Sequence, residues 1–452
     1  MEVWSDPLNC GRIALAIVLL AYAGSAFGQS ATPGTVLSVE ERDLVGEDIV
    51  VQGEFLDPAT IAERRKKVTP GGVDLLRLSD IDNHPIVTLS DALDGMPGVV
   101  VQDFFGGFDQ PRIQIRGSGL QQNPVERGTL FLLDGMPINR ADGSYIVGLA
   151  NPSAAEFIEV TRGYATNRLG ATVLGGALNF ASPTGSTFEG FGARAQGGSF
   201  GMIEGQFQGG FVTDSVDAFG SVTISRRDGF RDRNTSERAA ASVNFGIDLT
   251  DEITARFFAN YSDLSFDVVG PLTRTLLETQ PRSIFSGPTV TPGVPPVVTN
   301  PGPNVVRDRP MREARQFRIG TRATADFGAH ILDGSVGYTY TDDAFTFPIP
   351  GGIRETEGGD FAISARYSYW PDKNEGLPLF EATLSYAFGS ADRGYFHNIG
   401  GARGPQFGAN ELDASTLALF GGMNIPLGGG FVISPGLAYA YATRDNLDVF
   451  GN

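Results

Sequence analysis

The chain has 452 residues, of which 41% are hydrophobic and 10% aromatic, so it holds enough apolar material for more than one folded domain. Its 52 acidic and 34 basic side chains give a net charge of −18, which would repel phosphates and excludes nucleic acid as an expected partner. Glycine and phenylalanine are abundant, at 60 and 32 residues, a bias typical of many strands joined by turns and flanked by aromatic bands.

The amino-terminal segment has the features of a secretory signal peptide. Arg12 precedes an apolar run at 13–21, and small residues suited to cleavage come before Gln29. We therefore expect residues 1–28 to be removed on export. Because the sole cysteine of the sequence, Cys10, lies in this segment, the mature chain is expected to hold neither a disulfide nor a cysteine metal site.

Residues 29–72 are polar and interrupted by prolines, a composition typical of a flexible extension. They contain one apolar island within the sequence Glu47-Asp48-Ile49-Val50-Val51, and a charged run at 63–67 that we interpret as a solvated tether. After the signal, no segment approaches the roughly 18 uncharged apolar residues of a membrane helix, which excludes a helical membrane protein.

Residues 73–185 are predicted to form a compact mixed α/β domain. Ser90 is the expected N-cap of a short helix that ends near Gly95. Short β-rich runs separated by turn residues follow, and the Asp134-Gly135 pair is interpreted as a tight turn between two of them. The predicted strands lie at 99–101, 113–115, 129–133 and 158–160.

From residue 186 onward, segments of about ten residues carry apolar side chains at alternate positions, the period expected of a transmembrane barrel with one face in lipid. In 361–369, for example, Phe361 and Ile363 would face lipid while Ala362 and Ser364 face a wet interior. The same alternation recurs in 242–249, 254–261 and 380–388. A proline-rich stretch from 270 to 310 is long enough for an external loop.

Counting these segments predicts about 11 strands, whereas single-chain bacterial barrels close with an even number. The segments lie near 188, 202, 216, 239, 253, 313, 331, 360, 379, 414 and 431. Because each unpaired backbone group in hydrocarbon costs several kcal/mol, we expect the sheet to continue beyond Asn452 or to be completed by something else. The expected fold is mainly β, with a truncated N-terminal part of a barrel in 186–452.

The order of signal, apolar pentad, small glycine-rich domain and barrel resembles the TonB-dependent outer-membrane receptors. Four motifs of the small domain look like successive signatures of that family's plug domain, and the sequences at 139–145 and 167–172 are most similar to its ferric citrate branch. The four motifs are Ile113-Gln114-Ile115-Arg116-Gly117, Leu132-Leu133-Asp134-Gly135-Met136-Pro137, Ile158-Glu159-Val160-Thr161-Arg162-Gly163 and Leu174-Gly175-Gly176-Ala177-Leu178-Asn179-Phe180.

The resemblance implies an N-terminal plug, residues 73–185, inside an antiparallel barrel of about 22 strands when complete. It also implies that residues 47–51 are a TonB box, which adds as a strand to the periplasmic TonB energy transducer driven by its inner-membrane motor. Only about 18 residues separate the predicted cleavage site from this box, so the signalling domain of the ferric citrate branch is expected to be absent.

In the family, arginines of the Arg-Gly motifs meet barrel carboxylates. The resemblance therefore makes Arg116 and Arg162 candidates for a latch between plug and barrel. An equal alternative is that both arginines pair within the plug, with Glu159 or another plug carboxylate.

Ligand contacts are expected from loops that flank the plug strands, where aromatic and hydrogen-bonding side chains mix. Arg127 and Arg140 would hold an anionic chelate by bidentate hydrogen bonds, and a surface role is an equal alternative for each. The candidate ligand-binding residues are Phe105, Gln121, Gln122, Asn123, Arg127, Arg140, Asp142 and Tyr145.

An enzyme is not expected. Residues 197–201 match the spacing G-x-S-x-G of a hydrolase nucleophile, but the flanking patterns predict strands on both sides, so a hairpin turn is favoured. His84, His330 and His397 are too scattered to predict a metal cluster. We therefore expect no catalytic residues, no cofactor and no metal site.

The favoured function is energy-driven import, across the bacterial outer membrane, of a ferric siderophore or a ferric citrate-like chelate through movement of the plug. TonB-dependent uptake of cobalamin, haem or a saccharide remains an alternative, because loops carry no transferable code for the ligand. A passive porin, or a surface adhesin or phage receptor, is a further alternative, although a porin has no use for a lumen-filling domain or a transducer box.

Overall fold

A computed structural model describes most of the chain from residue 72 onward, as one compact unit. The described ranges are 72–77, 88–103, 111–118, 127–170, 175–299, 303–347, 351–372 and 377–451, with isolated residues Ala62, Glu63, Lys66, Thr69, Ile86 and Phe108. The predicted signal peptide, the predicted TonB box at Glu47–Val51, and the candidate ligand residues Phe105, Gln121, Gln122 and Asn123 lie outside these residues.

The plug is a mixed α/β domain built on a five-stranded sheet of order β1-β6-β7-β4-β5, in which β4 and β7 run parallel. A separate hairpin is formed by β2 and β3. The elements are β1 Val73–Arg77, α3 Leu89–Leu93, β2 Val99–Gln102, β3 Arg112–Ile115, β4 Thr129–Leu133, β5 Met136–Pro137, η2 Val147–Leu149, η3 Pro152–Ala154, β6 Phe157–Arg162, η4 Gly163–Leu169 and β7 Gly176–Ala181.

Two local predictions for the plug meet different outcomes. Asp134 and Gly135 form the predicted tight turn between β4 and β5, with φ of 56° and 78°, a conformation that a glycine adopts at little cost. The N-cap of α3 is Thr88, so the prediction of Ser90 is wrong. The Thr88 hydroxyl accepts from the amide of Asp91, whose side chain accepts from the amide of Thr88, and this reciprocal pair fixes the helix start two residues earlier.

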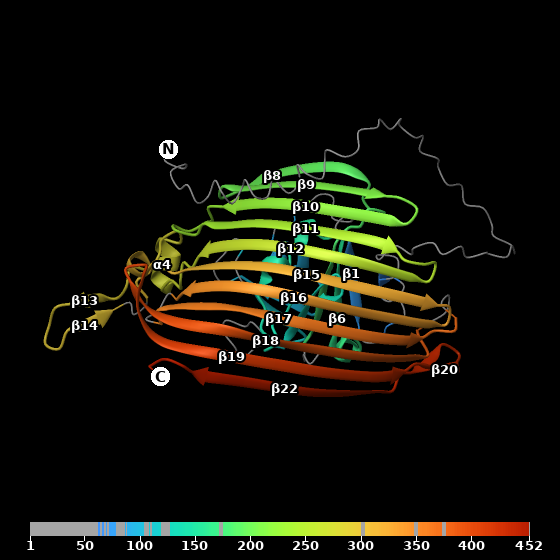
Figure 1. Ribbon diagram of the computed structural model, residues 1–452. Helices are drawn as coiled ribbons and strands as arrows, with labels where there is room; N and C mark the ends of the chain where they lie inside the picture. Colours follow the sequence, from blue (N-terminus) through green and yellow to red (C-terminus); the bar gives the residue numbers. More distant parts are fainter. Residues whose placement is uncertain are drawn as a thin grey trace. The chain divides into compact units, whose positions relative to one another are not determined.

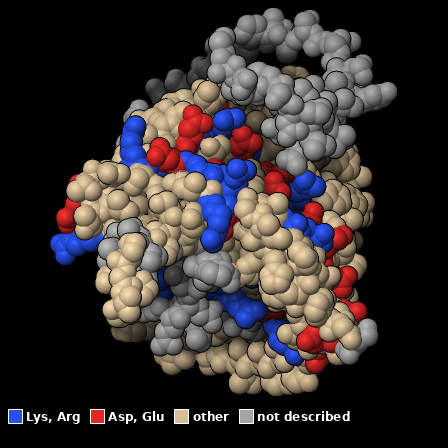
Figure 2. Space-filling model, turned by 90° about the vertical axis from the view of Figure 1, so that its left-hand side faces the viewer, with Lys and Arg blue, Asp and Glu red and all other residues tan. Residues whose placement is uncertain are grey.

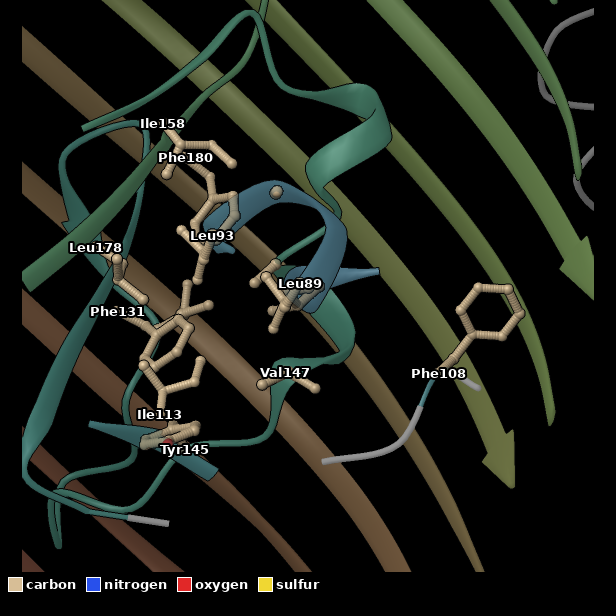
Figure 3. Close-up of a cluster of buried hydrophobic side chains, with 14 of the residues drawn as sticks. Leu89, Leu93, Phe108, Ile113, Phe131, Tyr145, Val147, Ile158, Leu178 and Phe180 are labelled. Atoms are coloured by element: carbon tan, nitrogen blue, oxygen red, sulfur yellow. The ribbon is translucent and has the colours of Figure 1, made fainter. Parts of the chain in front are cut away.

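The plug core lies between the five-stranded sheet and α3 (Figure 3). Phe131 is 0% exposed and its ring packs 4.3 Å from that of Tyr145 and 6.3 Å from that of Phe180, measured between centroids. Phe108 belongs to the same buried cluster, and the Arg238 guanidinium of β11 (Ser236–Asp248) lies 4.9 Å from its ring. The same buried cluster continues into the wall through Leu264 and Phe266 of β12 (Ile253–Asp267) and Phe345 of β16 (His330–Thr346).

The rest of the described chain forms an antiparallel sheet of 11 strands, as predicted, in which each strand pairs with its neighbours in the sequence (Figure 1). The strands are β8 Gly190–Gly198, β9 Met202–Val212, β10 Val216–Arg227, β11 Ser236–Asp248, β12 Ile253–Asp267, β15 Met311–Phe327, β16 His330–Thr346, β17 Ile353–Tyr369, β18 Phe380–Ile399, β19 Ala402–Met423 and β22 Gly436–Asp448. Residues 199–201, within the G-x-S-x-G sequence, are the turn between β8 and β9.

The two faces of this sheet differ as the alternating pattern predicted. Phe361 and Leu384 are about two-fifths exposed on the outer face, where the Phe361 and Phe388 rings stack 5.2 Å apart. Phe258, predicted to point inward, is buried. Among the described residues, no helix is long and apolar enough to cross a membrane.

Because consecutive strands are antiparallel, alternate connections lie at the same end of the sheet. The long segment between β12 and β15 therefore shares an end with the connection 228–235 and with Phe347, which follows β16. It contains α4 Arg274–Thr279, the hairpin of β13 Thr289–Thr291 and β14 Val297–Thr299, and α5 Val305–Asp308; the opposite end carries the hairpin of β20 Ile425–Gly428 and β21 Phe431–Ile433. We call the end that carries α4 the loop end.

Candidate functional site

Arg168, at the end of η4, is clamped against the inner face of the sheet. Its Nη1 donates to Glu381 Oε2 at 2.6 Å and its Nη2 to Asn424 Oδ1 at 2.8 Å, while Thr383 Oγ1 donates to its carbonyl at 2.9 Å. At Gly170, with φ of 70°, a Cβ would lie 2.7 Å from that of Ser385. The plug backbone therefore approaches the wall too closely for a side chain.

A second contact joins the plug to the wall around Asp360 of β17. Arg140 Nε lies 3.5 Å from Asp360 Oδ2, and the backbone amide of Ala141 donates to Asp360 Oδ1 at 2.8 Å. Thr416 Oγ1 of β19 donates to the carbonyl of Ala141 at 2.9 Å. Charge-assisted bonds of this kind hold a domain in place through few atoms, and they act here beside an apolar contact that includes Leu264 and Phe345 of the wall.

The two arginines expected to form the latch lie together inside the plug. Arg162 pairs with Asp74 of β1, so its ion pair follows the alternative in which the partner is a plug carboxylate. At Gly72, a Cβ would lie 3.1 Å from Arg162 Nη1 and 3.3 Å from Arg116 Nη2. Both guanidinium groups thus pack over Gly72, while Arg168 and Arg140 each make an ion pair that crosses to the wall.

Replacing Arg168 by Met is expected to weaken the hold on the plug by about 1–3 kcal/mol, because Glu381 keeps its partly buried charge but loses its cation. The plug should then release at a lower urea concentration, measured as the onset of channel conductance in planar bilayers. Arg315→Met is the matched control, since Arg315 alternates with the inward-facing residues of β15 and pairs with Asp263. An unchanged urea onset for Arg168→Met would show that the pair does not restrain the plug.

Two candidate ligand residues neutralise each other at the plug surface. Arg127 Nη2 donates to Asp142 Oδ2 at 2.6 Å, and Ser144 donates to Asp142 Oδ1 from its amide and its hydroxyl. Burial alone would raise the pKa of Asp142, but the Ser144 bonds and the Arg127 charge outweigh it and lower the pKa to about 2. Asp142 is therefore ionised at neutral pH, and Arg127 offers an anion less charge than the sequence suggests.

Tyr145 requires a correction, because its ring is 1% exposed and packs on Phe131 in the plug core. A ring in this position supports the plug sheet and does not face a ligand. Arg140 is also mostly enclosed, with its guanidinium against Asp360. Of the candidate ligand residues that the structure describes, Arg127 is the one with a largely exposed side chain.

A cationic and aromatic cluster on the inner wall, near the loop end, was missed by sequence reasoning. Arg312 of β15, Phe345 of β16 and Arg354 of β17 stand side by side in register. The two guanidinium carbons lie 5.4 and 5.9 Å from the Phe345 ring centroid, and Arg354 also lies 5.4 Å from the Phe347 ring. Asp343 holds Arg312 at 2.7 Å and lies 3.7 Å from Arg354. We call these five residues the external cluster.

Two arginines lie close to one carboxylate in the external cluster, with Asp343 at 2.7 Å from Arg312 and 3.7 Å from Arg354. Figure 2 shows Lys and Arg side chains gathered in the middle of the loop end, with the acidic side chains around them. A guanidinium that is held over an aromatic ring presents its N–H fork to carboxylates and leaves little side-chain freedom to lose on binding. Within the described residues, no group of His, Cys, Asp and Glu is arranged to hold a metal ion directly.

A small turn-rich domain, bound by polar and apolar contacts to one face of an antiparallel meander whose other face is apolar, has the architecture of a plug against part of an outer-membrane barrel. Residues 65–177 match the sequence model of the family described as TonB-dependent Receptor Plug Domain. The chain therefore carries a plug domain of this family, joined to an antiparallel sheet that has the fold of part of a barrel.

Solved structures share this fold at low sequence identity. The unliganded ferric citrate transporter FecA matches with a TM-score of 0.65 and 15% identity, over 84% of this chain and 57% of that chain. The ferric yersiniabactin uptake receptor FyuA from Yersinia pestis gives 0.60 and 13%, over 83% and 60%. The ferric-catecholate import receptor Fiu from E. coli K12 gives 0.59 and 13%, over 84% and 60%. The chain thus spans just over half the length of these structures.

Proposed function

We propose that the protein imports an anionic ferric chelate, such as a ferric siderophore or a ferric citrate-like complex, by TonB-driven movement of the plug. The observation that carries this proposal is the external cluster, whose two arginines share one carboxylate beside two phenylalanine rings. Guanidinium groups held beside aromatic rings on the inner wall suit a chelate that presents carboxylate oxygens on an organic frame.

The plug supports the same proposal through the nature of its attachment. Arg168 and Arg140 reach the wall through charged and amide groups, which water can solvate once they separate. A plug held in this way can shift under a modest pull, which a permanent stopper would not need to do. The pull would come from the TonB transducer through residues 47–51, and the ligand would reach the plug from the loop end.

The test is binding of radiolabelled ferric citrate, and of a set of ferric siderophores of known charge, to cells that produce the protein and to cells that lack it. We expect saturable binding of at least one anionic chelate, followed by accumulation. Arg354→Met should weaken binding about 10-fold or more, since a charge-assisted bond contributes about 1.5–3 kcal/mol. This variant leaves the Arg312 and Asp343 pair intact.

Arg315→Met again serves as the matched control and should bind as the native protein does. If every anionic chelate binds equally well to Arg354→Met and to the native protein, the external cluster is not the ligand site. If the cells accumulate a neutral or cationic ligand and no anionic one, the proposed cargo is wrong while the receptor class stands.

A further inference from the structure

Arg318 of β15 is enclosed between the wall and the plug, and the function described so far does not use it. Its side chain is 0% exposed. Nη1 lies 3.5 Å from the carbonyl oxygen of Leu133 in the plug, and within the described part of the chain Nε and Nη2 have no hydrogen-bond partner. The carboxylate that acts on it electrostatically, Asp134, accepts hydrogen bonds from the amide and hydroxyl of Ser182 instead.

The attraction of Asp134 offsets part of the cost of burying Arg318, but it supplies no hydrogen bond to Nε or Nη2. A cation taken out of water costs free energy that only good hydrogen bonds and a close counter-ion return, and an apolar side chain of similar length would avoid that cost. Arg318 keeps unused N–H donors in a place that water does not reach. Donors of this kind become useful when the group that covers them moves away.

The cover is the turn between β4 and β5 of the plug. Leu133 lies over Arg318, and at Gly135 a Cβ would come 3.0 Å from Nη1 of Arg322, the next inward-facing arginine of β15. Arg322 is held by Asp333 at 2.6 Å. Displacement of this single turn would therefore uncover Arg318 and further expose Arg322, whose side chain is already 36% exposed.

These arginines continue a series that starts at the external cluster. Arg312, Arg318 and Arg322 are separated by even numbers of residues, so all three point to the inner face of β15. At about 3.4 Å per residue, the steps are roughly 20 and 14 Å along the strand, away from the loop end. Arg312 donates to Asp343 and Arg322 donates to Asp333. Arg318 therefore has the weakest hydrogen-bond partner of these three arginines.

We propose that Arg312, Arg318 and Arg322 form an anion relay, along which an anionic chelate moves past the withdrawn plug. This inference rests on the proposed function. When the turn between β4 and β5 moves away, Arg318 becomes a temporary binding site. Its free N–H groups then donate hydrogen bonds to the carboxylates of a chelate that has dissociated from the external cluster. Passage through a pore needs sites that bind enough to admit the ligand and weakly enough to release it, which a series of separate guanidinium groups provides. Arginine suits the task because its fork binds carboxylates in pairs.

The test compares Arg318→Met, Arg318→Lys and Arg315→Met in cells that produce the protein, with ferric citrate and the anionic ferric siderophores as probes. For the chelate that the native protein imports, Arg318→Met should leave the binding constant at the cell surface within twofold and lower the maximal uptake rate at least 10-fold. Arg318→Lys should restore much of the rate, because it returns the positive charge, and Arg315→Met should match the native protein.

The urea onset of conductance separates a relay from a purely structural role. If the onset stays at the native value in Arg318→Met while uptake falls, the relay is supported. A shift in onset accompanied by an equal loss in Arg318→Lys would assign Arg318 to holding the plug and overturn the relay, as would native uptake in Arg318→Met. If the native protein neither binds nor imports an anionic chelate, the proposed function itself fails, whatever Arg318 does.

Discussion

Deletion of residues 47–51 is expected to abolish energised uptake while ligand binding at the cell surface stays unchanged. The apolar pentad is proposed to pair edge to edge with the transducer, and main-chain hydrogen bonds along an extended strand supply a grip that tolerates tension. The polar residues that follow give the length of chain through which the pull reaches the plug. Without the pentad, the plug keeps its contacts with Glu381 and Asp360 and the lumen stays closed.

Uptake in the deleted protein should fall to the level of cells without the receptor, measured with the chelate that the native protein binds. The binding constant should change less than twofold, because the external cluster lies on the wall strands. Deletion of residues 53–57 is the matched control, since it shortens the tether equally and leaves the pentad in place. Energised uptake that survives loss of the pentad would refute a pull through this segment.

Replacing Phe131 by Ala is expected to unfold the plug and to open the lumen. Phe131 packs against Tyr145 and Phe180 in the middle of the plug core, and a large cavity in such a core costs about 3–5 kcal/mol. A small domain has a free energy of unfolding of about 5–15 kcal/mol, so the substitution removes a large part of the plug's stability. The 11-stranded sheet should persist, because its backbone hydrogen bonds do not depend on Phe131.

The measurement is amide hydrogen exchange, which should accelerate in β4, β6 and β7 but not in β15 to β18. Cells that produce the variant should also become sensitive to antibiotics that are too large for ordinary porins. Phe245→Ala is the control, because Phe245 is exposed on the outer face and its loss leaves the plug untouched. Retained exchange protection in β4 of Phe131→Ala would contradict the assignment of Phe131 as a central core residue.

Periodic features of the sequence predicted the fold well. The strands alternate with a period of two, so the pattern gave the number of sheet strands and the outward position of Phe361. The turn at Asp134 and Gly135 was equally predictable, because its backbone conformation restricts the residue types. The start of α3 was missed since Thr88, Ser90 and Asp91 all suit a cap, and the choice between them depends on a reciprocal hydrogen bond.

The candidate site was harder to predict because its partners are distant in the sequence. Arg168 and Glu381 are 213 positions apart, and Arg140 meets Asp360 only through the curvature of the sheet around the plug. Tyr145 looked like a loop aromatic beside Asp142 and Ser144, yet it fills the core. Arg312 and Arg354 carry a usable signal, since both occupy inward positions of long strands, but Phe345 and Asp343 join them only by register.

The pairing order of the two sheets has a consequence for how the chain reaches its final form. Each long strand bonds to the strands before and after it, so the wall can be built hairpin by hairpin as successive segments arrive. In the plug, the edge strand β1 pairs with β6 and β4 pairs with β7, so neither pair can form until a strand much later in the sequence is available. The plug thus gathers partners from across its whole length, and its assembly is expected to be the slower and more concerted of the two events.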